Sequence, residues 1–261
     1  MYAMERREHI ESVLREEGRV AVVDLAVRFD VTTETVRRDL DAMESEGRLR
    51  RVHGGAVPKE RGSTREVPVI ERTAQRADAK RAIALRALDA IPPGFSGSIY
   101  LDAGTTTAAI AAMLPDRLAA FGGSAEVVTH SLTLAPIVAG VPSISLFIIG
   151  GRIRGVTAAA VGASTVRSIA AIRPDIAFIG ANGISAEFGL STPDAEEAAV
   201  KEAIVRAARR VVVVADSSKF GQELLVGFAA LSEIDVIVSD APVYTELSEA
   251  LATAGVEAWI A

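Results

Sequence analysis

The sequence predicts a two-domain α/β protein, in which a small helical domain precedes a larger domain built on a mostly parallel sheet. Three amphipathic helical patterns crowd the first 45 residues. A stretch with two prolines, one glycine and little apolar content follows at 58–69. From residue 98 onward, short apolar runs alternate with helical patterns, as in parallel sheets covered by helices. We therefore expect domains at 1–57 and 70–261, joined by a linker.

Composition excludes several classes of function. The 261 residues are 49% hydrophobic and contain no cysteine, which rules out disulfides, thiolate metal sites and cysteine nucleophiles. Only three histidines are present, so we expect neither a metal nor a cofactor. No stretch reaches the ~18–20 uncharged apolar residues that span a bilayer, and the N-terminus lacks an apolar signal core. We expect a soluble cytoplasmic protein with no membrane partner.

Three helices are expected in the first domain. Residues 5–16 and 22–29 each carry apolar side chains at helical spacing. Asp30 and Val31 leave room only for a tight turn into a third helix at 32–45. Two helices joined in this way predict a helix-turn-helix.

The third helix has one narrow apolar face, formed by Val36, Leu40 and Met43. Thr32 or Thr33 is expected to cap its first turn, because a hydroxyl there accepts from the free N–H groups. This face predicts packing against the two preceding helices.

The remaining faces of this helix carry Thr33, Thr35, Arg37 and Arg38. Short hydroxyls at the start and guanidinium groups one turn later suit a recognition helix in the major groove of DNA. The alternative is a solvated amphipathic helix whose two arginines pair with nearby carboxylates, namely Glu34, Asp39 or Asp41.

A basic hairpin is expected after this helix. Residues 48–52 alternate polar and apolar, as an edge strand does, and 53–56 form a glycine-rich tip. A hairpin beside a recognition helix is a wing. The wing residues expected to contact DNA are Arg48, Arg50, Arg51 and His53.

The net charge of −6 argues against indiscriminate binding of nucleic acid. Residues 48–76, however, hold eight basic side chains against three acidic ones. Phosphate contacts are local, so this distribution matters more than the sum. We expect DNA affinity that falls steeply with added salt.

The second domain is expected to begin with a long helix at 70–91. Strands are then predicted at 98–101, 126–129, 145–149, 175–179, 211–215, 236–239 and 256–260. Helices are predicted from the turn at 102–107 through 113, and at 132–139, 163–171, 193–208 and 243–254.

Polar residues cluster where strands give way to helices, which is where ligands bind in open α/β sheets. The sharpest cluster is Gly104, Thr105, Thr106 and Thr107, preceded by Asp102. A glycine, successive N–H groups and hydroxyls at a helix N-terminus bind phosphate. The alternative is an ordinary turn capped by threonine.

A second cluster contains Asp194, Glu196, Glu197 and Lys201. Glu197 and Lys201 have the i,i+4 spacing of a surface ion pair, and the alternative is that Asp194, Glu197 and Lys201 line the crevice and hold sugar hydroxyls. Asp216 and Lys219 follow a buried strand, where a lysine can meet a phosphate or simply lie in solvent.

The segment TTETVRRDLDAMESEGRLRRVHGGA resembles the winged helix-turn-helix signature of the DeoR family of bacterial transcriptional repressors. One departure is Ala21, where that family often has a capping Ser or Thr. The resemblance implies an operator-binding regulator that works as a homo-oligomer, a dimer or a tetramer.

The second domain resembles the sensor domain of the same family, on the segments LDAGTTT, GGRIRG, DIAFIGANGISAEFGLSTPDAEEAAVK and VVVVADSSKFG. The resemblance spans about residues 5–240 and implies a fold like ribose-5-phosphate isomerase and glucosamine-6-phosphate deaminase, with a phosphorylated sugar as effector. It implies that Gly104–Thr107 hold phosphate and that Lys219 closes the site. The residues implied around the sugar are Asp102, Asn182, Asp194, Glu197 and Lys201. His130 stands where the family usually has Asn, and we expect it to titrate near neutral pH.

Two other functions compete with a sugar-phosphate-controlled repressor. One is a sugar-phosphate isomerase with an accessory DNA-binding domain, in which Asp194 or Glu197 acts as the general base. The other is a protein–protein module that uses the N-terminal helices. The winged helix-turn-helix favours the regulator, because a metabolic enzyme needs no DNA reader.

Overall fold

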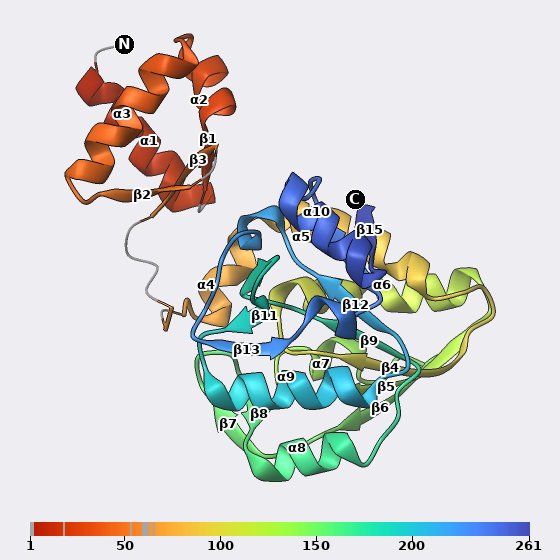
Figure 1. Ribbon diagram of the computed structural model, residues 1–261. Coiled ribbons are helices and arrows are strands. Elements are labelled where there is room, and N and C mark those ends of the chain that lie inside the picture. Colours follow the sequence, from red (N-terminus) through yellow and green to blue (C-terminus); the bar gives the residue numbers. More distant parts are fainter. Residues whose placement is uncertain (1–2, 18, 53, 59–62, 65) are drawn as a thin grey trace. The chain divides into compact units, whose positions relative to one another are not determined.

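The computed structural model describes residues 3–17, 19–52, 54–58, 63–64 and 66–261 (Figure 1). The chain divides into two compact units, Met1–Arg65 and Glu66–Ala261. Each unit has its own buried apolar core.

The first unit contains three helices: α1 (Ala3–Glu17), α2 (Val22–Phe29) and α3 (Thr33–Ser45). All three expected helices are therefore present. Val36 and Leu40 are fully buried, as their spacing predicted. Asp30 ends α2 in the left-handed conformation, with φ of 52°, which turns the chain sharply into α3.

A three-stranded antiparallel sheet completes this unit, in the order β1 (Val20–Ala21), β3 (Gly55–Pro58) and β2 (Leu49–Val52). β2 lies at the edge, as its alternating pattern predicted. A Cβ at Gly55 would lie 2.0 Å from the carbonyl oxygen of Val20, so only glycine lets β3 approach β1 here.

The second unit is organised by a seven-stranded sheet in which every pairing is parallel. Valine and isoleucine dominate its central strands, which suits strands buried on both faces. The strand order is β15 (Glu257–Ile260), β14 (Val236–Ser239), β12 (Val211–Val214), β9 (Ile176–Ile179), β4 (Ser96–Leu101), β5 (Ser124–Thr129) and β6 (Ile144–Ile148).

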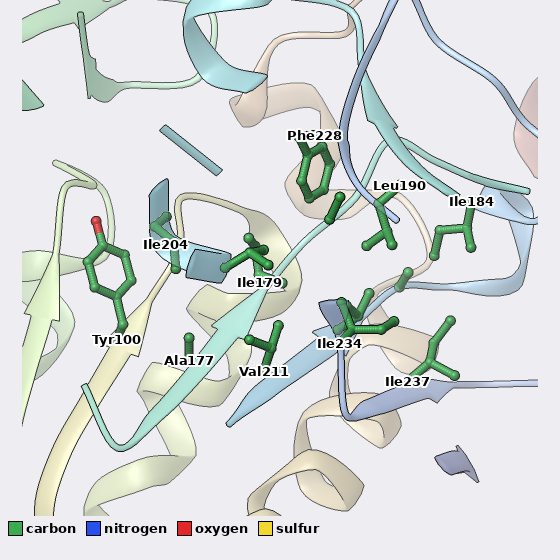
Figure 2. Packing of buried hydrophobic residues seen from close by; sticks show 14 of the residues in the cluster. Tyr100, Ala177, Ile179, Ile184, Leu190, Ile204, Val211, Phe228, Ile234 and Ile237 are labelled. Atoms are coloured by element: carbon green, nitrogen blue, oxygen red, sulfur yellow. The ribbon is translucent and has the colours of Figure 1, made fainter. Parts of the chain in front are cut away.

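Helices cover both faces of this sheet, and alternate residues of the five inner strands divide between two cores. One core contains residues of α5 (Ala77–Ala87), α6 (Thr105–Ala120) and α7 (Ala135–Val138). The other contains residues of α8 (Ala163–Ala170), α9 (Ala195–Ala207) and α10 (Thr245–Ala254). Figure 2 shows the second core, where Tyr100 and Ala177 stand beside Ile179 and Ile204.

The prediction of a single helix at 70–91 is wrong. The structure has α4 (Val69–Ala74), then α5, then a 3-10 turn at Leu88–Ala90. Arg76 breaks the run in the left-handed conformation, with φ of 52°. Its guanidinium is held by Ser217 and by Asp240, whose carboxylate is 2.5 Å away, so contacts remote in sequence offset the local helical preference.

Five short strands of the second unit were not predicted, because each is too short to show a periodic pattern. These strands are β7 (Arg152–Arg154), β8 (Ala159–Val161), β10 (Gly183–Ser185), β11 (Gly189–Thr192) and β13 (Val226–Ala229). Two of them, β7 and β8, form a hairpin directly after the edge strand β6. The other three, β10, β11 and β13, form a small antiparallel sheet, and two of its strands contact α9.

Candidate DNA-binding surface and effector site

Three threonines, Thr32, Thr33 and Thr35, lie at the N-terminus of α3. Thr32 is the N-cap, and its hydroxyl accepts from the N–H of Thr35 at 3.2 Å. The hydroxyls of Thr32 and Thr35 lie 2.9 Å apart, and Thr33 is exposed beside them. The first turn therefore presents hydroxyl groups at the helix end that recognition helices place near base edges.

Arg37 and Arg38 are both exposed on α3. Arg37 lies 3.7 Å from Glu34 in a solvent-exposed pair that contributes little to stability. Within the described residues, Arg38 has no ion pair. Asp39 faces inward instead and binds Arg6 of α1 at 2.5 Å. Of the pairings in the alternative from sequence, the one between Arg37 and Glu34 is therefore present, whereas within the described residues neither arginine pairs with Asp39 or Asp41.

The wing arginines differ in how they are held. Arg48 pairs with Glu11 and with Glu46, so its guanidinium stabilises the domain. Arg51 pairs with Asp41 of α3 and fixes the wing against that helix. Arg50 is exposed on the edge strand. His53 lies outside the described residues.

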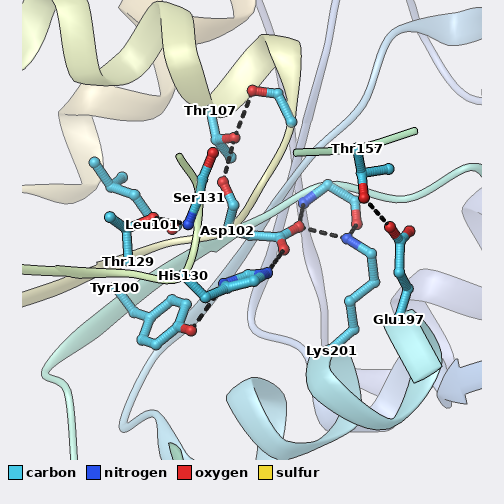
Figure 3. A network of polar contacts seen from close by, with 12 residues as sticks. Tyr100, Leu101, Asp102, Thr107, Thr129, His130, Ser131, Thr157, Glu197 and Lys201 are labelled. Atoms are coloured by element: carbon cyan, nitrogen blue, oxygen red, sulfur yellow. Dashed lines mark hydrogen bonds and ion pairs between the residues drawn. The ribbon is translucent and has the colours of Figure 1, made fainter. Parts of the chain in front are cut away.

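The polar residues of the second unit gather at the carboxyl ends of β4, β5, β9 and β12. Figure 3 shows the residues that follow β4 and β5. Parallel strands end at one edge of the sheet, which brings segments distant in sequence together there. Asp102 follows β4, His130 follows β5, and Gly180 follows β9.

The turn from Gly104 to Thr107 opens the sixteen-residue helix α6. Gly104 is the N-cap and provides no side-chain cap, so the first N–H groups of the helix have no side-chain acceptor. The Thr107 hydroxyl donates to the Asp102 carbonyl at 2.6 Å and is therefore used to fix the turn. Thr105 is half-buried, and Thr106 is buried. Such an N-terminus is suited to binding an anion.

Asp102 and Lys201 form a buried ion pair at the centre of this edge. Lys201 Nζ lies 2.5 Å from Asp102 Oδ2 and 2.9 Å from the carbonyl oxygen of Gly180. The N–H of Gly180 donates to the same carboxylate oxygen at 2.9 Å. Asp102 Oδ1 is buried without a hydrogen-bond partner among the described residues, so one acceptor remains for a ligand.

His130 is buried between Tyr100 and Asp102 (Figure 3). Its Nδ1 lies 2.9 Å from the Tyr100 hydroxyl, and its Nε2 lies 3.7 Å from Asp102 Oδ1. Burial lowers the pKa of His130 to about 4, although the Asp102 charge opposes that shift. The expected titration near neutral pH is therefore wrong, because the imidazole is neutral there.

Glu197 and Lys201 do not form the surface pair that their spacing suggested. Both side chains are buried, and Lys201 is engaged by Asp102. Glu197 accepts from Arg154 at 3.2 Å and from Thr157. Burial raises the pKa of Glu197, with a further increase from the nearby charge of Glu66. The carboxylate thus lies in an interior network.

Asp194 and Asn182 each make a structural contact. Asp194 caps α9, where its Oδ1 accepts from the N–H groups of Glu196 and Glu197 at 3.1 and 3.0 Å. Asn182 is half-buried after β9, and its side-chain oxygen accepts from the Thr192 hydroxyl at 3.1 Å. Both residues are thereby fixed in place.

Lys219 ends the 3-10 turn at Ser217–Lys219, directly after β12. Sequence reasoning missed the basic residues beside it. Lys80 of α5 is buried, and its ammonium donates to the Arg72 carbonyl. Burial lowers the pKa of Lys80 to about 8, and the charge of Lys219 contributes to the shift. Arg76 lies 3.5 Å from Asp216. Only the fold brings α5 to this strand end, so no local pattern marks these residues.

The described residues hold no group of three or more His, Asp or Glu side chains placed to bind a metal ion. None of their helices is both long and apolar enough to cross a membrane.

A winged helix-turn-helix with exposed arginines, joined to an α/β unit whose central sheet gathers buried polar side chains at its carboxyl edge, is the architecture of a ligand-responsive regulator of transcription. Family models agree with this class. One, described as the DeoR-like helix-turn-helix domain, matches residues 6–61. Another, described as the DeoR C terminal sensor domain, matches residues 75–241. The chain belongs to the DeoR family, which confirms the resemblance found in the sequence.

Several relatives match over nearly the whole chain. The HTH-type transcriptional regulator GlpR of Haloferax volcanii is 35% identical over 97% of this chain and 96% of its own. A putative aga operon transcriptional repressor of Escherichia coli O157:H7 is 32% identical over 97% and 92%. The glycerol-3-phosphate regulon repressor of Escherichia coli K12 is 29% identical over 93% and 92%. The regulator is confirmed over the isomerase alternative, because these relatives are named as regulators.

Among solved structures, ribose 5-phosphate isomerase A of Methanocaldococcus jannaschii is 19% identical with a TM-score of 0.41, covering 55% of this chain and 54% of the isomerase. The mixed α/β fold class is confirmed by the parallel sheet itself and by the two matching domain families.

Proposed function

We propose that this chain represses an operon of sugar metabolism and that a phosphorylated sugar, bound at the carboxyl edge of the sheet, releases it from DNA. The observation that carries the proposal is the N-terminus of α6, which lacks a side-chain cap and begins three residues after Asp102, the buried partner of Lys201. A phosphate is the ligand that such a helix end binds best.

The names of the relatives support this class of effector. One relative is named for the glycerol-3-phosphate regulon and another for the aga operon. In this chain, Gly104–Thr107 would hold the phosphate, and Lys219 would close over it, with Lys80 adding positive charge. The hydroxyls of the sugar would reach the side chains of Asp102, His130, Asn182, Asp194, Glu197 and Lys201.

For DNA binding, the proposal uses both helix α3 and the wing of the first unit, which together we call the reader. Helix α3 would enter the major groove with Thr33, Thr35, Arg37 and Arg38 toward the bases and backbone, while Arg50 would reach a phosphate from the wing. Repeated half-sites require more than one reader, so we propose a homo-oligomer that places two of them on one operator.

A thermal-shift screen tests the effector. Glycerol 3-phosphate, fructose 1-phosphate and deoxyribose 5-phosphate are compared with the unphosphorylated compounds and with inorganic phosphate. A bound effector raises the melting temperature by an amount set by its concentration over its dissociation constant. We expect one phosphorylated compound to stabilise the wild type and to lose that effect in Thr105→Ala. Equal shifts with the unphosphorylated compounds would overturn the proposed phosphate site.

A further inference from the structure

Arg154 connects the candidate effector site to the first residue of the second unit. Its Nη1 lies 2.5 Å from Glu66 Oε2 and 3.2 Å from Glu197 Oε1. Its Nε lies 3.3 Å from Asp194 Oδ2. One nitrogen, with two protons, is therefore shared between a carboxylate of the effector site and a carboxylate at the start of the unit.

Glu66 is fixed although it adjoins the segment that leads to the DNA-binding unit. Its side chain is only 5% exposed, and Arg72 of α4 lies 3.9 Å from its second oxygen. That oxygen is buried without a hydrogen-bond partner among the described residues. The N–H of Val69 also donates to the Val156 carbonyl at 2.8 Å, so the turn between β7 and β8 holds the start of α4.

Carboxylates outnumber guanidinium groups in this cluster. Glu66, Asp194 and Glu197 all contact the guanidinium of Arg154, and Arg72 is a second, more distant partner of Glu66. Glu197 also accepts from Thr157. A group that hydrogen-bonds Glu197 changes how strongly that carboxylate competes with Glu66 for their shared atom, Nη1 of Arg154. A group that hydrogen-bonds Asp194 acts on the same guanidinium through Nε.

We propose that Arg154 couples effector binding to DNA binding, by altering its hold on Glu66 when the effector engages Asp194 and Glu197. The inference rests on the proposed function, because it takes the effector to bind beside Asp194 and Glu197. Coupling between sites requires an element that both ligands bias, and the Glu66–Arg154 pair is that element.

The decisive variant is Glu66→Gln, which keeps the shape of the side chain and removes its charge. The matched control is Glu71→Gln, which makes the same change at an exposed position of α4. Full-length proteins are titrated with a duplex that the wild type has selected from a random pool, with and without glycerol 3-phosphate or the panel compound that stabilises the wild type most.

We expect the effector to change DNA affinity of the wild type and of Glu71→Gln by a factor on the order of 10 to 100, as is usual for allosteric coupling. In Glu66→Gln the factor falls toward 1, while effector affinity measured without DNA stays within about twofold of the wild type. The Val69 amide should also exchange with solvent at a rate that the effector alters in the wild type but not in this variant.

A coupling factor in Glu66→Gln equal to that of the control overturns the inference and leaves the proposed function standing. If no panel compound binds the wild type, the proposed effector class fails. The inference is then decided by DNA affinity alone, because disturbing this pair must shift operator affinity several-fold relative to Glu71→Gln, and equal affinities overturn it.

Discussion

Lys201 and Asp102, 99 positions apart in the sequence, form a buried ion pair 2.5 Å long at the carboxyl edge of the central sheet. Their side chains are 7% and 1% exposed, so neither charge is solvated. The pair joins α9 to the end of β4. It thereby fixes the floor of the candidate effector site.

Removing the ammonium should destabilise the second unit strongly. Lys201→Met leaves the Asp102 carboxylate buried with the Gly180 N–H as its remaining hydrogen bond, and we expect a loss of roughly 3–5 kcal/mol of unfolding free energy. Urea unfolding followed by the fluorescence of Trp259, the single tryptophan, reports on this unit. The control is Arg206→Met, which breaks an exposed pair with Glu202 and should cost about 0.5 kcal/mol or less. Equal losses in the two variants would contradict the buried pair.

The neutral state of His130 makes the second unit sensitive to acid. Its pKa is about 4 in the folded protein and about 6.5 when unfolded, so the unfolded chain binds the proton first as the pH falls. Stability is therefore lost between pH 6.5 and 4, and by pH 5 the loss is ~2 kcal/mol. His130→Asn should lack this component. Urea unfolding at pH 8 and pH 5 measures the difference between the two proteins, and parallel losses in both would show that His130 is not responsible.

Because of Lys80, effector affinity should decrease at alkaline pH. Burial lowers its pKa to about 8, with contributions from the charges of Lys219, Arg72 and Arg76, whereas Asp216 opposes the shift. A bound phosphate favours the ammonium form, so affinity should fall as the pH rises through 8, by up to about tenfold per pH unit. Calorimetric titration at pH 7 and pH 9 measures this slope. In Lys80→Gln we expect weaker binding at pH 7 and little further loss at pH 9, and a slope as steep as that of the wild type would exclude Lys80 from the site.

The two classes of arginine in the reader should respond differently to substitution. Arg38 is exposed on α3, whereas Arg48 is held by Glu11 and Glu46. Arg38→Ala should weaken operator binding about tenfold or more. The slope of log affinity against log salt concentration should also become less steep, by about one for each phosphate that the side chain no longer neutralises. Arg48→Ala should affect operator affinity less and thermal stability more. Fluorescence anisotropy at several salt concentrations tests both, and unchanged affinity in Arg38→Ala would show that α3 does not read DNA through this residue.

Local patterns were enough to predict most of the architecture. Val36, Leu40 and Met43 marked the buried face of α3, and the valine runs marked the central strands. Thr32 caps α3 as expected, and Ala21 gives α2 no side-chain cap, also as expected. These features depend on residues within one turn or one strand of each other.

The parts that sequence reasoning missed depend on contacts between distant segments. Arg76 breaks a helical run because it binds Asp240, 164 positions away. Asp39 is acidic and lies on a polar stretch, yet it is buried because Arg6 meets it from another helix. Lys80 lies near Asp216 and Lys219 only because α5 packs on the sheet near β12 and β14. No spacing rule within one element contains this information.

The order of strands in the central sheet has a consequence for how the protein is made. β4 lies between β5 and β9. The hydrogen bond from the Ser98 hydroxyl to Asp175, 77 positions later, can form only after that later segment has been synthesised. The helices and wing of the first unit, by contrast, contact one another within the first 58 residues. Synthesis from the N-terminus therefore completes the reader well before the sheet can close, since local contacts form sooner than distant ones. A chain that stops early would therefore still contain a folded winged helix-turn-helix but would have lost the sensor, so its DNA binding could no longer respond to an effector.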